Sequence, residues 1–270
     1  MKLALCIWSL VLGHCLAGPF FGGQPGVVAS QGFAPPAPIS DYTPSAYGSI
    51  AVKWWLAARK ESFANNDAVG TFTDRSSSAI NATQSTGSKQ PTFKTAQVNS
   101  LPAVQGDGVD DVMTMTSNPA SGASAVTVMW VGKMAADPAA SAASSANLLG
   151  QFGTGANDHM TWIDGVCYLG LFSNSRKTVG NITPNVSQWH LYTIISKSGG
   201  WTMRVDGTQV FTTASNTVGI GSNPLLFSSQ ADAQTYFASG LLAEVVIWNG
   251  ELTGTDLTTE ENGLKTQYGL

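Results

Sequence analysis

The strongest constraint on the fold is a series of short apolar and β-branched segments separated by turn signals. Between residues 50 and 228 many of these segments follow one another at spacings of roughly 8–12 residues, with almost no helical periodicity. Such a series predicts an all-β fold in which two antiparallel sheets pack face to face as a sandwich. The segments are residues 52–56, 92–93, 101–104, 112–115, 126–131, 148–152, 159–163, 166–172, 189–196, 201–205, 208–212 and 225–228.

One run of the sequence has the pattern of a meander of strands. Residues 189–197 alternate between the two faces of an extended chain. Glycine-containing turns at 198–200 and 206–207 separate this run from residues 201–205 and 208–211. We therefore predict three consecutive antiparallel strands, which build one curved sheet with a concave face.

The C-terminal stretch predicts a strand followed by a helix. Residues 241–248 are apolar or β-branched, and a turn signal follows at Asn249-Gly250. Residues 252–264 are mostly polar with helical spacing, and Gly269 is suited to end a helix. We predict that the strand closes a sheet and that one short helix ends the chain.

The N-terminus is organised differently from the rest of the chain. Residues 1–17 combine a lysine, an apolar run and small residues, Cys15 and Ala17, in the order of a secretory signal. The run is shorter than the about 20 residues that span a bilayer, so we expect no stable membrane span. The alternative is a hydrophobic N-terminal arm that inserts into a virion assembly. Residues 18–47 are rich in Gly and Pro and predict a linker or arm, and residues 48–270 form one predicted domain.

Composition limits the classes of partner. Charged residues make up 11% of the chain, less than half of the usual share of about 25%, so Ser, Thr, Asn and Gln must supply the polar surface. This composition suits extracellular and virion proteins. The net charge is −4 and the Lys and Arg residues are scattered, which argues against a nucleic-acid partner. Cys167 is the one cysteine after residue 17, so we expect no internal disulfide and a buried thiol.

Several motifs, in their order and spacing, resemble the laminin-G-like domains of the concanavalin A-like lectin/glucanase family. The segments that carry the resemblance are 74–84 (D-R-S-S-S-A-I-N-A-T-Q), 90–92 (Q-P-T), 101–111 (L-P-A-V-Q-G-D-G-V-D-D), 189–210 (W-H-L-Y-T, then W-T-M-R-V-D-G-T-Q-V), 240–248 (G-L-L-A-E-V-V-I-W) and 268–270 (Y-G-L). The resemblance implies a jelly-roll sandwich of two antiparallel sheets over roughly residues 52–270. Domains of this family occur in secreted bacterial proteins, in eukaryotic surface proteins and in phage fibres, where most bind glycans or other proteins.

Hydrolytic chemistry is not expected. Glycoside hydrolases need two carboxylates that flank the scissile bond, and in hydrolases with this fold both come from one strand. No glutamate of the chain has a carboxylate two residues away, and Glu260 and Glu261 are adjacent on the predicted helix. Glu244 lies alone on a predicted strand, where we expect a structural hydrogen-bond acceptor. We therefore predict a protein that is not an enzyme.

The segment 107–111 is the candidate metal site. Asp107, Asp110 and Asp111 place three carboxylates within five residues, and carboxylate oxygens are the ligands that calcium prefers. The alternative is that Asp107-Gly108 makes a tight turn in which the other carboxylates bind backbone amides. Calcium is the one cofactor that the sequence suggests.

A carbohydrate site needs aromatic faces for the C–H surface of a sugar and polar side chains for its hydroxyls. The candidate platform is a group of residues near predicted loop ends: Asn157, Asp158, His159, Trp162 and Tyr168. We predict a secreted recognition module that binds glycan or a cell-surface glycoconjugate. The alternative is a virion structural protein, a fibre or capsid decoration, that contacts other virion subunits through its N-terminal arm.

Overall fold

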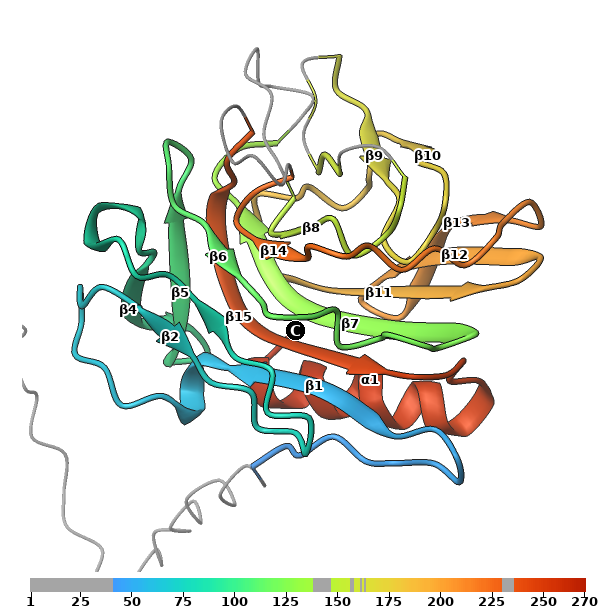
Figure 1. Ribbon diagram of the computed structural model, residues 1–270, viewed down its shortest axis with the longest axis horizontal. Coiled ribbons are helices and arrows are strands. Elements are labelled where there is room, and N and C mark those ends of the chain that lie inside the picture. Colours follow the sequence, from blue (N-terminus) through green and yellow to red (C-terminus); the bar gives the residue numbers. More distant parts are fainter. Residues whose placement is uncertain (1–40, 138–146, 156–157, 161, 163, 230–235) are drawn as a thin grey trace, which may run out of the picture. The chain divides into compact units, whose positions relative to one another are not determined.

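The computed structural model describes residues 41–137, 147–155, 158–160, 162, 164–229 and 236–270. All of them belong to one compact unit, residues 39–270. The predicted signal segment, residues 1–17, and most of the predicted linker lie outside the described residues. The unit consists of antiparallel strands and one α-helix, so the predicted all-β sandwich with a C-terminal helix is confirmed (Figure 1).

The elements are mostly short. Two 3-10 helices, η1 (Ala58–Lys60) and η2 (Gly87–Lys89), accompany the strands, and the helix α1 spans Gly254–Tyr268. The strands are β1 (Val52–Ala57), β2 (Thr71–Phe72), β3 (Ala82–Thr83), β4 (Thr92–Val98), β5 (Leu101–Asp107), β6 (Met113–Thr114), β7 (Ala125–Met134), β8 (Leu149–Gly150), β9 (Cys167–Leu169), β10 (Lys177–Gly180), β11 (His190–Lys197), β12 (Gly200–Val205), β13 (Thr208–Thr213), β14 (Leu225–Leu226) and β15 (Ser239–Trp248).

Two sheets make the sandwich. The larger has eight strands in the order β13-β12-β11-β7-β15-β5-β4, with β1 also paired to β15. The ten-residue β15 lies against β7 on one side, and on its other side it pairs first with β5 and then with β1. The smaller sheet has the order β2-β3-β6-β14-β8, and β9 pairs with β10 in a separate ribbon. The predicted closing strand is therefore the central strand of the larger sheet.

The predicted meander is confirmed as β11, β12 and β13. Residues Asp206 and Gly207 join β12 to β13 with φ angles of +51° and +85°. Two consecutive left-handed residues form the kind of turn whose twist matches that of a β-hairpin. The Asp-Gly signal thus fixes this turn locally.

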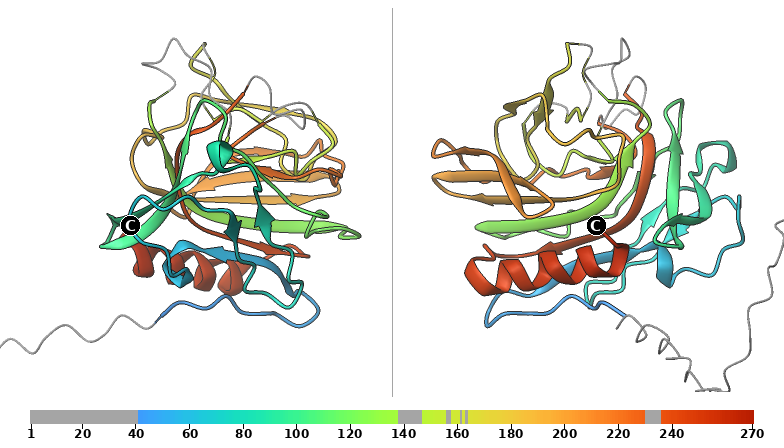
Figure 2. Two further views of the ribbon diagram at one scale, coloured as in Figure 1. Left: turned by 60° about the vertical axis from the view of Figure 1, so that its left-hand side comes forward. Right: turned by 180° about the vertical axis from the view of Figure 1, so that it is seen from behind.

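The larger sheet is buried on both faces. Its inner face meets the smaller sheet through fully buried aromatic side chains, including Trp54, Trp130 and Phe152. Its outer face packs under α1, where Trp248 and Tyr268 belong to a second apolar cluster. Figure 2 shows α1 running along this face. Gly269, with φ of +67°, follows the helix and donates its N–H to Lys265 O, so the predicted glycine cap is confirmed.

Residues 41–47, which the sequence assigned to the linker, pack against this outer face. The hydroxyls of Tyr42 and Tyr47 each donate to the carboxylate of Glu260 at 2.5 Å. Trp248 Nε1 donates to the backbone oxygen of Ser45 at 2.8 Å. The described part of the sandwich therefore begins before residue 48, and we call residues 41–47 the strap.

Among the residues that the structure describes, no helix has the length and apolar character needed to span a membrane.

Candidate functional site

One end of the sandwich holds the acidic turn and the described residues of the predicted platform. β5 ends at Asp107, which pairs with Ser239 at the start of β15. Tyr236 lies just before β15, and the turn that contains Asp110 follows β5. Figures 1 and 2 show the β5 turn, the start of β15 and the loops around β9 at this same end, which we call the loop end.

Three rings from two distant segments meet at the loop end. The ring centroids of His159 and Trp162 lie 4.3 Å apart, and those of His159 and Tyr236 lie 5.1 Å apart. Trp162 and Tyr236 complete the set with a centroid separation of 5.8 Å. His159 is buried, whereas Trp162 and Tyr236 are half-buried and present part of their surface to solvent. We call these three residues the aromatic trio.

Tyr168 lies beside the trio. Its backbone exchanges two hydrogen bonds with His159, at 2.7 and 2.8 Å. Its hydroxyl donates to Asp164 at 2.8 Å, and the guanidinium of Arg176 lies 4.7 Å from the centre of its ring. The Tyr168 ring thus has one face covered by a cation, and its hydroxyl group is held by a carboxylate.

The predicted platform is therefore only partly a surface. Trp162 and Tyr168 are half-buried, as a contact surface requires, but Asp158 is 2% exposed. Asp158 Oδ1 accepts from the backbone N–H of Gly170 at 2.5 Å, and the N–H of Gln151 also binds this carboxyl group. The prediction that Asp158 faces a ligand is wrong, because its side chain points inward and holds two neighbouring segments together.

Of the two remaining platform residues, one is buried and the other is not described. His159 is 2% exposed and supports Trp162 rather than forming part of the surface. Asn157 lies outside the described residues. Sequence reasoning missed Tyr236, which stands in a polar segment with no motif and reaches the trio because Ser228 bridges to Phe237. Its aromatic character just before a buried strand was the one available signal.

Burial also changes the acidity of Asp158. The removal of its carboxyl group from solvent raises its pKa to about 7, against the opposing effect of the hydrogen bonds from Gly170 and Gln151. The inward face of the loop end is therefore a poor place for a negative charge.

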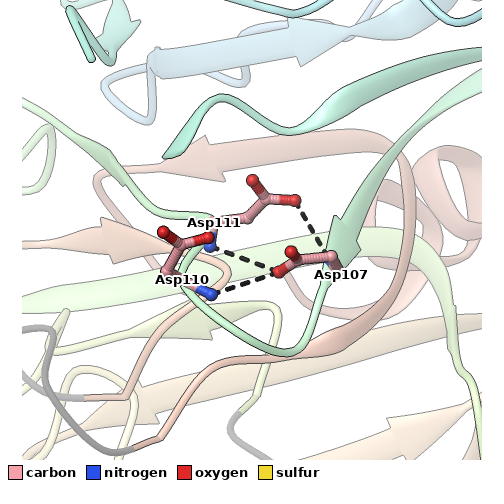
Figure 3. A group of neighbouring side chains, drawn as sticks. All are labelled: Asp107, Asp110 and Asp111. Carbon is pink, nitrogen blue, oxygen red and sulfur yellow. Dashed lines mark hydrogen bonds between the residues drawn. The ribbon is translucent and has the colours of Figure 1, made fainter. Parts of the chain in front are cut away.

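The acidic turn has the hydrogen bonds to backbone amides that the turn interpretation predicts, and its three carboxylates lie close together (Figure 3). Asp107 Oδ1 accepts from the N–H groups of Val109, Asp110 and Asp111 at 2.8, 3.2 and 3.3 Å, and Asp111 Oδ2 accepts from Asp107 N at 2.9 Å. One oxygen of each of the three carboxylates lies within 4.8 Å of the others. Burial, with the neighbouring charges of Asp107 and Asp110, raises the pKa of Asp111 to about 6. A bound cation would offset the repulsion among these three carboxylates. The residues therefore fit calcium, which prefers oxygen ligands, as part of a larger ligand set.

Comparison with known proteins identifies the family. The family model described as the concanavalin A-like lectin/glucanases superfamily matches residues 107–258. The chain belongs to this superfamily. No curated protein matches the sequence.

Several solved structures are similar to this chain at low sequence identity. The binding domain of botulinum neurotoxin serotype D matches with a TM-score of 0.54 and 11% identity, covering 79% of this chain and 51% of that chain. Domain 4 of AbnA, a GH43 extracellular arabinanase from Geobacillus stearothermophilus solved with arabinotriose, matches at 0.50 and 10%, covering 78% and 98%. A GH54 α-L-arabinofuranosidase matches at 0.51 and 11%, covering 74% and 51%. This chain therefore spans about half the length of the first and third of these chains, and the likeness concerns the fold.

Some members of the superfamily are glucanases, which makes the isolated carboxylate on β15 relevant. Glu244 is fully buried and accepts four hydrogen bonds. Trp55 Nε1 and Arg59 Nη2 donate to Oε1 at 2.6 and 3.2 Å, and Arg59 Nε and the Tyr268 hydroxyl donate to Oε2 at 2.9 and 2.6 Å. This carboxylate joins β1, η1, β15 and α1, which is the structural role that the sequence predicted.

A second motif of the superfamily, the W-H and D-G pair, is also structural here. His190 Nδ1 lies 2.7 Å from Asp206 Oδ2, and its Nε2 lies 3.1 Å from Asn185 O. Asp206 Oδ1 accepts from Leu191 N at 2.9 Å. Although burial opposes it, the hydrogen bond with His190 lowers the pKa of Asp206 below its usual value. The pair ties the start of β11 to the turn between β12 and β13.

Proposed function

We propose that this protein is a non-catalytic recognition module that binds carbohydrate at the loop end through the aromatic trio. The observation that carries the proposal is the convergence of Trp162 and Tyr236, two half-buried rings from distant segments, on His159. Aromatic faces bind the C–H surfaces of sugars, and polar groups around them read the hydroxyls. Membership of a superfamily named for lectins supports this chemistry, as does the similarity to a domain solved with arabinotriose.

The proposal includes no hydrolysis. A glycosidase needs one carboxyl group as acid and a second as nucleophile or base, on either side of the scissile bond. Described donors occupy both oxygens of Glu244, and Asp158 is turned inward to bind backbone amides. Neither carboxylate is placed to act on a sugar bound at the trio.

The test of this proposal is a glycan array probed with the full-length chain and with two tryptophan variants. Trp162→Ala removes a ring of the trio, and Trp189→Ala removes another half-buried indole outside it. Loss of one sugar–aromatic contact of about 1.4 kcal/mol weakens binding roughly tenfold. We expect this loss in Trp162→Ala and unchanged binding in Trp189→Ala. Equal binding by both variants, or no glycan bound by the unaltered protein, contradicts the proposal.

We further propose that calcium binds the acidic turn and stiffens the loop end. Asp110→Asn is the useful variant, since Asp107 and Asp111 accept the hydrogen bonds that hold the turn. We expect calcium to raise the melting temperature of the unaltered protein, a chelator to reverse the rise, and Asp110→Asn to reduce it. The absence of any rise in the unaltered protein would refute the metal site and leave the turn as a structural feature.

Export to the cell exterior belongs to the same proposal. Its support is the signal-like order of residues 1–17 and the low content of charged residues. The intact mass of the protein isolated from its source tests it, because export by this route removes residues 1–17. Retention of these residues favours the virion alternative, in which the N-terminal arm contacts other virion subunits.

A further inference from the structure

The sequence contains three triplets of the form Asn-x-Ser/Thr, which begin at Asn81, Asn181 and Asn185. Such a triplet is the acceptor for an N-linked glycan in proteins that pass through a eukaryotic secretory route. A glycan has to extend into solvent from a side-chain amide nitrogen that the fold does not use. The structure therefore distinguishes among the three asparagines.

The amide group of Asn81 belongs to the fold. This residue is half-buried, and its Oδ1 accepts from the backbone N–H of Asp74 at 2.9 Å. The carboxylate of Asp74 in turn accepts from the backbone N–H groups of Trp55 and Ile80, at 3.0 and 2.8 Å. The Asn81 side chain thus helps to fix a loop against β1, and a glycan on it would be crowded by that loop.

The loop between β10 and β11 carries the other two triplets. Asn181 is exposed, but a proline follows directly after its triplet. Pro184 restricts the backbone of Thr183, which supplies the hydroxyl that the acceptor triplet requires. This restriction makes Asn181 a poorer acceptor than Asn185.

The triplet at Asn185 has an open amide nitrogen. Asn185 is exposed, and its Oδ1 accepts from the backbone N–H and the hydroxyl of Ser187, at 2.8 and 2.7 Å. The hydroxyl of the triplet therefore lies against the carboxamide group of its own asparagine. Nδ2, which is the atom that carries an N-linked sugar, donates to none of the described residues.

The backbone around Asn185 is held firmly by the sandwich. Val186 is buried, and its backbone oxygen accepts from the N–H of Met134, on β7, at 2.8 Å. Asn185 O accepts from Gln188 N at 3.0 Å and lies 3.1 Å from Nε2 of His190. The loop consequently holds Asn185 at the surface, where its Nδ2 can be substituted without the loss of a contact to the described residues.

We propose that Asn185 carries an N-linked glycan, transferred during export from an oligosaccharide on a lipid pyrophosphate. A bond forms between Nδ2 and C1 of the first sugar, and the bond from C1 to the pyrophosphate oxygen breaks. The lipid pyrophosphate leaves, and Nδ2 loses one proton. Oδ1 is not consumed, so it still accepts from Ser187. This inference rests on the export that forms part of the proposed function, and it adds a modified residue.

The test is mass spectrometry of the protein isolated from its source, as intact chain and as peptides. The sample is measured before and after treatment with an amidase that removes N-linked glycans and leaves aspartate in place of the modified asparagine. We expect the peptide that contains Asn185 to carry the mass of hexoses and N-acetylhexosamines. After treatment this peptide should contain aspartate at position 185, whereas Asn81 should remain asparagine.

Variants exported through the same route show whether the triplet is the cause. Asn185→Gln and Ser187→Ala should each lose the sugar mass, because the first removes the acceptor nitrogen and the second removes the hydroxyl of the triplet. Ser187→Thr keeps a hydroxyl and should keep the glycan. Asn81→Gln is the matched control, and it should carry the same sugar mass as the unaltered protein.

The outcomes separate this inference from the proposed function. Protein that lacks residues 1–17 and has an unmodified Asn185 would overturn the inference and leave export standing. Protein that keeps residues 1–17 and has no sugar would overturn both. A glycan on Asn181 or Asn81 in place of Asn185 would show that exposure and the free amide nitrogen do not select the site. Carbohydrate binding at the trio is tested separately by the glycan array.

Discussion

Asp158 links the chemistry of one residue to the pH dependence of the whole fold. Its pKa rises from the ordinary value of 3.8 to about 7 on folding, because burial removes the carboxyl group from water. The folded protein therefore holds this proton more tightly than the unfolded chain does. The resulting contribution to stability is complete below about pH 4 and is lost as the pH rises through about 7.

Asp158→Asn should flatten this dependence. The amide keeps an oxygen that accepts from Gly170 N, but it cannot ionise. We expect the melting temperature of the unaltered protein to fall more between pH 5 and pH 8 than that of the variant. Asp111, whose pKa is raised to about 6, also makes the melting temperature fall with rising pH, and this smaller effect is the same in both proteins. Asp256→Asn, on the first turn of α1, is the control and should follow the unaltered profile. Parallel profiles for Asp158→Asn and the unaltered protein would show that this carboxyl group is not the cause.

The sequence could not predict the burial of Asp158. A short Asn-Asp-His segment before a strand is typical of an exposed loop, and exposure depends on what else folds over it. Here the backbone of Gly170 and the ring of Tyr236 come from elsewhere in the chain and cover that segment. Glu244 shows the opposite case, because a single carboxylate within an apolar strand can be stable only with donors around it, whichever residues supply them.

The turn between β12 and β13 carries the next prediction. Gly207 has a φ of +85°, and a Cβ in this region costs roughly 1–2 kcal/mol. We expect Gly207→Ala to lower the free energy of unfolding by about this amount in urea titrations. Gly87→Ala is the control, because Gly87 has no atom within 4 Å of an added Cβ and no positive φ. Equal stability of the two variants would show that the left-handed backbone at this turn relaxes at no cost.

Elements with a local cause were predictable, and those with a distant cause were not. The meander follows from alternation and from turns such as Asp206-Gly207, which act over a few residues. The two-residue strands β2 and β3 were not predicted, because pairing with distant residues, rather than their own pattern, makes them strands. Residues 159–163 were predicted as a strand, but among the described residues of this segment the structure has a single bridge, His159 with Tyr168.

At the scale of the whole molecule, the larger sheet has a core on each face. α1 and the strap cover the outer face, where Trp248, Leu252 and Leu264 are buried. A sandwich sheet normally has one solvated face, and the alternation in the sequence of β11 predicts one, but β11 is buried on both faces. The near-continuous apolar run of β15 does not predict a solvated face, and it indicates a strand covered on both sides. The sequence could reveal this double burial, but not that residues 41–47 help to provide it.

Glu260 is the residue that joins the strap to the rest of the molecule. It is 2% exposed, and it accepts from the hydroxyls of Tyr42 and Tyr47 and from the backbone N–H of Ser45. Glu260→Ala leaves these donors without their acceptor. Hydrogen bonds to a charged group contribute about 1.5–3 kcal/mol each, and part of the loss is recovered by hydration of the released strap. We therefore expect the free energy of unfolding to fall by about 2–3 kcal/mol.

Limited proteolysis distinguishes release of the strap from general destabilisation. We expect Glu260→Ala to be cut within residues 41–50 under conditions that leave the sandwich intact, because the strap has lost its attachment to α1. Glu251→Ala is the matched control. Glu251 forms an ion pair with Lys197 in which both side chains are partly exposed, and such pairs contribute about 0–1 kcal/mol.

Sugar binding at the trio should be unchanged in both variants, because the strap lies on the outer face of the larger sheet and the trio lies at the loop end. If Glu260→Ala resists cleavage as well as Glu251→Ala does, the apolar contacts of Tyr42 and Tyr47 hold the strap without the carboxylate.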